Sequence, residues 1–92
     1  MAVPFLADDK DPSSIVPYQI DWSDELAGDS IIASSWDVPA PFQMVHSSFS
    51  TTVATVVISG GAVGRTLAIT NTITTAAGSK EPRSIQIYCR KL

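Results

Sequence analysis

The sequence predicts an all-β protein: a small antiparallel β-sandwich of the immunoglobulin-like kind, with an extended N-terminal arm. From Val16 onward, apolar and polar residues alternate with a period of two, which is typical of strands that bury one face. About six such runs follow one another at a spacing of roughly ten residues, with turn-forming residues between them. The chain has 92 residues, which is enough for one domain with one thin core.

The first fifteen residues differ from the rest, and we therefore expect two parts. These are an extended N-terminal arm over residues 1–15 and the β-sandwich domain over residues 16–92. Pro4 and Pro12 bracket an acidic, turn-prone run, and the segment shows no strand or helix periodicity. It is expected to be either a frayed terminus or an arm that docks on a neighbouring subunit. Docking would use its apolar residues, which have no local partner: Val3, Phe5 and Leu6.

Each expected strand of the sandwich carries one shared face. In chain order these faces are formed by Tyr18, Ile20 and Trp22; by Ile32, Ser34, Trp36 and Val38; by Ala54, Val56 and Ile58; by Leu67, Ile69, Asn71 and Ile73; and by Ile85, Ile87 and Cys89. A weaker strand is expected over residues 42–50. One helical turn is expected at residues 23–27, with Ser23 as its cap and Gly28 closing it.

Turn residues separate these strands. Pro39 and Pro41 end the second one, because proline cannot donate a hydrogen bond to a strand ladder. Gly60 and Gly61 suit the positive φ of a tight turn. Residues 76–80 turn the chain before the last strand.

The two tryptophans are expected to differ in burial. Trp36 lies in the middle of a strand, as does the buried tryptophan of immunoglobulin-like sandwiches, and we expect it in the core. Trp22 precedes a turn rich in carboxylates and is expected to be partly exposed. The inter-sheet disulfide of that fold is missing, because Cys89 is the single cysteine.

Composition and charge exclude several classes of function. The net charge is −3 and the pI about 4.7, which argues against binding to a nucleic-acid backbone. No signal segment opens the chain, and no apolar run is long enough to span a membrane. A single cysteine in so small a chain favours a reducing cytoplasm or stabilisation by oligomerisation. Charged residues make up only 16%, so the surface is easily desolvated against another protein.

No group of residues predicts catalysis, a cofactor or a metal site. Four carboxylates lie between Asp21 and Asp29, but their spacing does not fit a calcium-binding loop, so we expect a structural turn rather than a weak cation site. The single histidine, His46, has no nucleophile motif to serve and too few partners for zinc. Cys89 is expected to be a small core residue. The glycine-rich run 60–65 is followed by a strand and not by the helix that a phosphate-binding loop needs.

Several segments carry a further pattern: Asp11-Pro12; Tyr18-x-Ile20-Asp21-Trp22-Ser23-Asp24-x-Leu26-x-Gly28-Asp29; Ser35-Trp36-x-Val38-Pro39; Ser59-Gly60-Gly61-x-x-Gly64; Thr70-Asn71-Thr72-Ile73-Thr74-Thr75-Ala76-Ala77-Gly78; and Arg83-Ser84-Ile85. In order and spacing, this set resembles small virion proteins of the head-gene modules of tailed bacteriophages, the fibre-head-domain-like group. The resemblance covers nearly the whole chain after the first ten residues. It implies an immunoglobulin-like virion component on or near the capsid, with no catalytic residues. Glu25 departs from the pattern, because many such sequences have an aromatic residue in that region.

The leading functional hypothesis is a non-enzymatic phage virion protein that is made in the host cytoplasm. It would decorate or cement the capsid surface, bound to the major capsid protein as a homo-oligomer, with no nucleic acid or membrane as partner. One alternative is a head–tail connector or fibre-attachment protein. Another is a carbohydrate-binding module with Trp22 and Tyr88 as stacking platforms. The residues expected to contact partners are Val3, Phe5, Leu6, Trp22, Asp24, Asp29, Gly61, Arg65 and Lys80.

Overall fold

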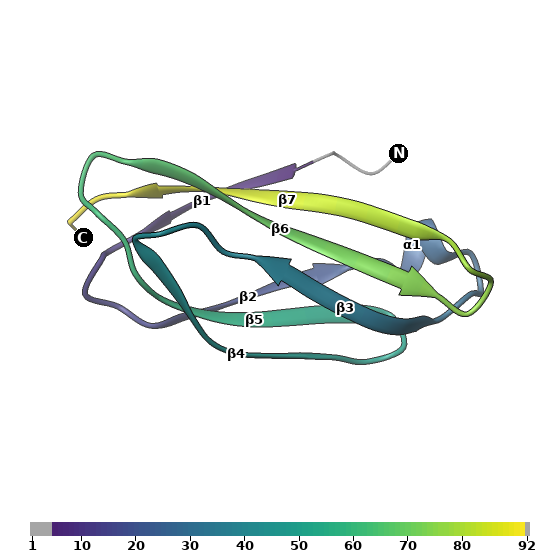
Figure 1. Cartoon of the computed structure of the whole chain (residues 1–92). Helices are drawn as coiled ribbons and strands as arrows, with labels where there is room; N and C mark the ends of the chain where they lie inside the picture. The colour runs from purple at the N-terminus through teal and green to yellow at the C-terminus, as the bar shows by residue number, and fades with distance from the viewer. Residues whose placement is uncertain (1–4, 92) are drawn as a thin grey trace.

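Two β-sheets pack face to face in a computed structural model of the chain, which describes residues 5–91 and the side chains of residues 9–91 (Figure 1). The elements in this range are β1 (Phe5–Lys10), β2 (Val16–Asp21), α1 (Ser23–Leu26), β3 (Ile31–Asp37), β4 (Phe42–Phe49), β5 (Val53–Gly60), β6 (Thr66–Thr75) and β7 (Lys80–Cys89). The domain is elongated along the strands, with extents of 41 × 26 × 17 Å. The predicted fold class, a small all-β sandwich, is confirmed.

The order of the strands follows the immunoglobulin arrangement. One sheet has the order β2-β5-β4 and the other the order β1-β7-β6-β3. In the constant-type immunoglobulin domain, the second, fifth and fourth strands share one sheet, and the third, sixth and seventh share the other. The same division holds here. The first strand differs, because β1 lies at the edge beside β7 and pairs with it in parallel.

The strand β1 was not expected. Its residues run from Phe5, opposite Ser84, to Lys10, opposite Cys89, so this part of the predicted arm lies in a sheet of its own chain. The absence of alternation in the first fifteen residues gave no sign of this strand, and the division into an arm and a sandwich domain stays a prediction. Alternation reports side-chain burial, whereas an edge strand can be held by its backbone hydrogen bonds even when its sequence is polar. Val3 and the side chains of Phe5 and Leu6 lie outside the described residues, and docking of the arm on a neighbour stays a prediction.

The core lies between the inner faces of the two sheets and matches most of the predicted strand faces. The buried hydrophobic residues are Tyr18, Ile20, Trp22, Leu26, Ile31, Phe42, Ala54, Val56, Ile58, Ile69, Ile73, Ile85, Ile87 and Cys89. Trp36 is half-buried and packs against this cluster. Cys89 is fully buried with a free thiol, as expected for a small core residue.

The predicted inner face of β3 is wrong at its first position. Ile32 is 59% exposed, while its neighbour Ile31 is buried. The cause is a shift in the pairing of β3 with β6, where Ile31 lies opposite Thr75 and Ala33 lies opposite Thr74. The extra residue between them, Ile32, is left outside the ladder, as in a β-bulge. Because a bulge exchanges the two faces of a strand, strict alternation assigned Ile32 to the core.

Candidate functional site

Three segments meet at one end of the sandwich, which we call the α1 end: residues 21–31, residues 50–53 and residues 75–83. Backbone hydrogen bonds join them. The Trp22 N–H donates to the Thr52 carbonyl over 2.8 Å, and the Ala76 N–H donates to the Ser30 carbonyl over 2.9 Å. Three segments that are distant in the sequence therefore form one continuous surface, at the right-hand end of the molecule in Figure 1.

Asp29 joins its own turn to the loop at residues 76–80, which contains the predicted contact residue Lys80. Its Oδ1 accepts hydrogen bonds from the Ser30 N–H at 2.8 Å and from the Ala77 N–H at 3.3 Å. A hydrogen bond with the Thr75 side chain is the main reason that the pKa of Asp29 lies below its ordinary value, and the Ser30 N–H adds to the effect. The carboxylate is thus a structural acceptor in the charged form, and the loop at residues 76–80 is positioned by it.

The short helix α1 begins differently from the prediction. Its N-cap is Trp22, with no hydrogen bond from a capping side chain, and Ser23 is already helical. Asp21 replaces the expected Ser23 cap, because its Oδ1 accepts the Ser23 N–H at 2.9 Å, and this contact lowers the pKa of Asp21. The helix ends at Leu26, and its C-cap is Ala27, which has the left-handed φ of 49° and lies one residue before the glycine that was expected to close the helix.

The side chain of Trp22 is buried in the core at the α1 end. It is 1% exposed, so the prediction that it is partly exposed is wrong. Its indole Nε1 donates to Asn71 Oδ1 at 2.9 Å, and Asn71 Nδ2 donates to Ser34 Oγ and to the Ser35 carbonyl, each at 2.9 Å. Asn71 is itself fully buried, so both ends of its amide are satisfied inside the protein. The carboxylates near Trp22 in sequence misled the prediction, since Asp21, Asp24 and Glu25 are exposed while the indole is buried.

Arg83 covers the outer side of Trp22. Its guanidinium lies 4.4 Å from the centre of the indole ring, and its Nη2 lies 3.2 Å from Glu25 Oε1. The Arg83 side chain is 13% exposed and that of Glu25 is 41% exposed, so the pair lies at the boundary between core and solvent. Stacking of a guanidinium on a tryptophan and pairing with a carboxylate both fix α1 against β7.

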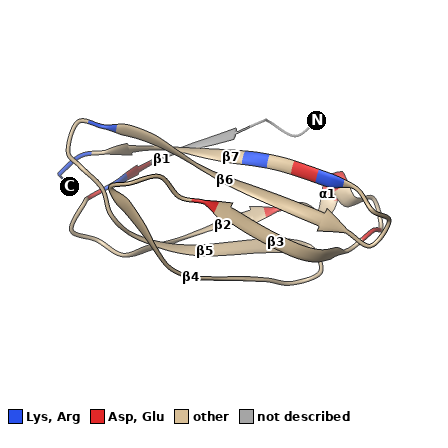
Figure 2. Ribbon diagram, viewed as in Figure 1, with Lys and Arg blue, Asp and Glu red and all other residues tan. Residues whose placement is uncertain are grey.

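The net negative charge of the protein is concentrated at the α1 end. Its acidic residues are Asp21, Asp24, Glu25, Asp29 and Glu81, against the two basic residues Lys80 and Arg83. This excess of three carboxylates equals the formal net charge of −3 for the whole chain. Figure 2 shows coloured segments at this end, at the opposite end and at the end of β3, while β4 and β5 contain no Lys, Arg, Asp or Glu. The α1 end is therefore an acidic surface.

The other two predicted contact residues, Gly61 and Arg65, lie at the opposite end of the sandwich. There the Cys89 N–H donates to the Arg65 carbonyl at 2.8 Å, which closes the turn between β5 and β6 onto the end of β7. A Cβ on Gly61 would lie 2.9 Å from Cys89 Sγ, so the turn packs tightly on the core. Of the predicted contact residues with described side chains, Gly61 and Arg65 therefore lie at one end, and Trp22, Asp24, Asp29 and Lys80 lie at the other.

Lys10 is a buried basic residue at this opposite end. It is 1% exposed, and its Nζ donates to three backbone carbonyls: Asp11 at 3.0 Å, Ser14 at 2.6 Å and Gly60 at 2.8 Å. Burial lowers the pKa of its ammonium group. Because these carbonyls belong to the β1–β2 connection and to the end of β5, Lys10 ties the end of β1 to the second sheet.

No contact or structural role at these ends was assigned from the sequence to four of these residues: Lys10, Glu25, Asn71 and Arg83. A signal existed for Asn71, because an asparagine on the inner face of a strand has to find partners when it is buried. For Lys10 no signal existed, since it stands in a polar run and its three acceptors are backbone groups that only the fold brings together.

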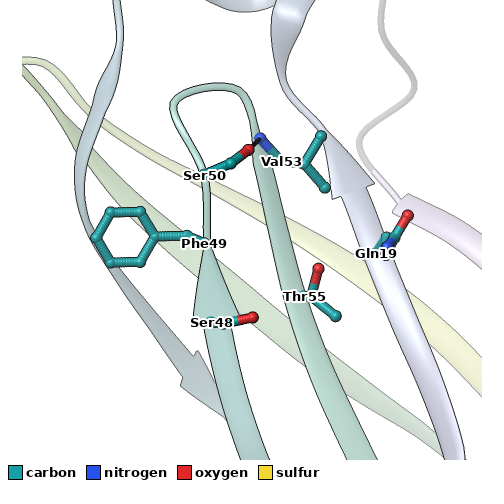
Figure 3. A pocket seen from close by; sticks show the side chains of 6 residues that line it. All are labelled: Gln19, Ser48, Phe49, Ser50, Val53 and Thr55. Carbon is teal, nitrogen blue, oxygen red and sulfur yellow. Dashed lines mark hydrogen bonds between the residues drawn. The ribbon is translucent and has the colours of Figure 1, made fainter.

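A shallow hollow lies on the outer face of the three-stranded sheet beside the α1 end (Figure 3). It is lined by Gln19, Ser48, Phe49, Ser50, Val53 and Thr55. The Ser50 Oγ accepts the Val53 N–H at 3.1 Å, so this hydroxyl is used in the β4–β5 turn. The lining is neutral and carries hydroxyl, amide and apolar groups, which can form hydrogen bonds but lack a nucleophile with an adjacent base.

Among the described residues, no three His, Cys, Asp or Glu side chains are grouped closely enough to hold a metal ion. No helix among them is long and apolar enough to cross a membrane.

Comparison with known proteins gives one family. Residues 10–88, most of the chain, match the family model described as podophage GP4 fiber-tail adaptor protein gp77. No curated protein matches the sequence.

Proposed function

Because the chain belongs to the podophage GP4 fiber-tail adaptor (gp77) family and is a phage virion protein, we propose that it joins a fibre to the tail. The family match over residues 10–88 is the observation that carries this proposal. The adaptor would act by binding through its surfaces, and we assign it no catalytic step.

The two ends of the sandwich support a bridging role. An adaptor has to hold two partners at once, and this domain presents different chemistry at ends separated along its 41 Å long axis. The α1 end is acidic, whereas at the opposite end the basic residues Arg65, Arg90 and Lys91 lie with the acidic residues Asp9 and Asp11, and Arg90 forms an ion pair with Asp9. The predicted contact residues Asp24, Asp29 and Lys80 belong to the first end, and Gly61 and Arg65 belong to the second. We propose that each end binds one of the two virion proteins.

The fibre-attachment alternative is thus favoured over capsid decoration. The family description names a fibre–tail adaptor, so the partners we propose are a tail protein and a fibre protein rather than the major capsid protein. The phage setting that the sequence resemblance implied agrees with the family match. Membership of the fibre-head-domain-like group stays a prediction.

The carbohydrate-binding alternative is weakened by the position of Trp22. A stacking platform has to be open to the sugar, and this indole is buried beneath Arg83. Tyr88, the second predicted platform, is 42% exposed but lies on β7, without a partner platform from Trp22.

Phage particles assembled without this protein test the proposal. We expect such particles to have intact capsids and tails but no fibres, and we expect added purified protein to restore fibre attachment, as seen by electron microscopy. Particles that keep their fibres but lose capsid stability would support decoration and overturn the adaptor role.

The acidic end provides a matched pair of variants. Asp24→Lys changes an exposed residue of the α1 end that the structure shows in no ion pair or hydrogen bond, and Gln86→Lys changes an exposed residue of β7 away from that end. Asp24→Lys changes the net charge by one unit more than Gln86→Lys does. We expect Asp24→Lys, but not Gln86→Lys, to reduce fibre attachment, with the wild-type interaction weakened by salt.

A further inference from the structure

The strand β4 is exposed but contains no Asp, Glu, Lys or Arg. Every position from Gln43 to Ser50 is exposed, and β4 is the last strand of the sheet β2-β5-β4, so one edge of its backbone is unpaired. Between Asp37 and Arg65 the chain has no Asp, Glu, Lys or Arg, and its one histidine, His46, lies on β4. A charged side chain on this strand would remain solvated in the folded monomer and would cost it little. The fold of a single copy therefore does not explain why charge is missing here.

The other three sheet edges are protected in the ways that natural proteins use against edge-to-edge pairing. Edge strands usually carry charges, prolines or bulges that block such contacts. The sequence of β1 includes two aspartates, β2 contains Pro17 and ends in Asp21, and β3 ends in Asp37. Of these devices, β4 has only a bulge, at Val45 between Met44 and His46. Its segment His46–Phe49 continues the ladder without interruption.

Apolar side chains line this same edge. Met44 is 48% exposed, Val45 53% and Phe49 45%, and Ile32 on the neighbouring edge strand β3 is 59% exposed. These four residues belong to the seven large hydrophobic residues that are exposed in the described part of the chain. Burying such side chains against another protein releases free energy of about 25 cal/mol per Å² of apolar surface. An unpaired backbone and exposed apolar side chains therefore lie along one edge.

We propose that the β4 edge pairs with the β4 edge of a second copy of this chain, antiparallel about a two-fold axis. In such a pair each residue lies opposite its own copy or another residue of the same strand, so any charge on the strand would meet a like charge nearby. A strand without Asp, Glu, Lys or Arg avoids this repulsion, and among the described edge strands β4 is the one that has none of them. A partner of different sequence would impose no such requirement, because opposite charges could match across the interface.

Pairing of this kind closes after two copies. It joins the two three-stranded sheets into one sheet of order β2-β5-β4-β4-β5-β2, whose outer edges are both β2. Pro17 cannot donate to a further ladder and Asp21 would face like charge, so growth stops there. The bulge at Val45 confines regular pairing to His46–Phe49. This dimer goes beyond the adaptor role and can be tested without any fibre or tail protein.

The experiment compares Ser48→Lys with Gln86→Lys in the purified full-length protein. Both replace an exposed, neutral residue of a strand by lysine, the first on β4 and the second on the central strand β7. We expect wild type and Gln86→Lys to be dimers in sedimentation equilibrium and light scattering, and Ser48→Lys to be a monomer with an unchanged circular dichroism spectrum. Hydrogen exchange adds a second readout, with amides of residues 46–49 protected in wild type and at least ten-fold faster in Ser48→Lys.

Three outcomes would overturn the inference. A monomeric wild type at about 100 μM, roughly a hundred times a micromolar dissociation constant, would exclude a useful self-contact. A dimeric, folded Ser48→Lys would place the contact on another surface. A monomeric wild type that binds a fibre or tail protein, and loses that binding in Ser48→Lys, would show that a partner's strand occupies the edge. If Ser48→Lys fails to fold, Ser47→Lys takes its place, since Ser47 is also exposed on β4.

Discussion

Replacing Asn71 by leucine tests whether the buried amide holds the α1 end onto the core. Asn71 has no exposed surface, accepts the Trp22 indole N–H, and donates to Ser34 Oγ and the Ser35 carbonyl. Leucine has a similar volume but no polar atom, so the Asn71→Leu variant removes these three hydrogen bonds and leaves their partners in place. We expect the domain to fold but to be much less stable.

The expected loss follows from the groups left unpaired. The Trp22 N–H is buried, and the Ser35 carbonyl faces the same site, so each would lose its partner at a cost of about 1–3 kcal/mol. Ser34 lies in a half-buried position where water can replace the lost bond. Added apolar burial by leucine offsets about 1 kcal/mol. The net loss should be about 2–4 kcal/mol, against a total stability of roughly 5–14 kcal/mol for a domain of this length.

Urea denaturation followed by tryptophan fluorescence measures the effect. A double-mutant cycle with Trp22→Phe isolates the indole–amide bond, because Phe leaves no N–H to be unsatisfied. We expect the double variant to be more stable than the sum of the single losses by about 1–2 kcal/mol, with unchanged m values. If Asn71→Leu costs less than about 1 kcal/mol, or if the two losses add within about 0.5 kcal/mol, the reasoning is refuted.

Three further predictions concern a turn, a buried lysine and a carboxylate. Gly60→Ala should lower the free energy of unfolding by more than about 2 kcal/mol in urea denaturation, since its Cβ would lie 2.7 Å from the Pro41 carbonyl oxygen at a φ of +82°. The control Gly28→Ala, at a φ of +96° with open space around it, should lower it by only about 1 kcal/mol. Equal losses of stability in the two variants would contradict this reasoning. Lys10→Met keeps the aliphatic stem but leaves three carbonyls without the Nζ donor, so the free energy of unfolding should fall by about 1–3 kcal/mol. In hydrogen exchange followed by mass spectrometry, β1 should become the strand whose amides exchange fastest. Unchanged exchange of β1 would show that Lys10 does not hold β1 to the second sheet. Because folding lowers the pKa of Asp29, this carboxylate stabilises the fold above the ordinary pKa of 3.8, and the stabilisation is lost as the pH falls through the lower folded pKa. Asp29→Asn should therefore flatten the acid side of a plot of melting temperature against pH. An unaltered slope would argue against this role of Asp29.

Much of the fold could be predicted because sandwich strands bury one face. The inner faces at Ile20, Val56, Ile73 and Ile87 follow directly from alternation, and all four are buried as expected. The turn at Gly60 was also readable, because few residues other than glycine tolerate its positive φ. The contact segments at the two ends were found as loops, although nothing in the sequence indicated that Asp29 joins two of them.

Errors arose where backbone pairing or a distant partner outweighed local pattern. A bulge that strict alternation cannot show placed Ile32 outside the core. Trp22 was expected near the surface, but a partner 49 positions away, Asn71, receives its N–H inside the protein. The strand β1 was missed because its pairing with β7 uses main-chain groups, which every sequence possesses.

The amino-acid sequence was therefore sufficient for the all-β class, most of the strand faces and the stretch without Asp, Glu, Lys or Arg that contains β4, since these depend on the spacing and type of nearby residues. The tertiary structure alone decided which edge that stretch forms, which carboxylates gather at the α1 end, and that Lys10 lies buried among three carbonyls. The physical reason is that edge position, surface charge and burial depend on contacts between segments far apart in the chain, and these contacts exist only after the two sheets have packed.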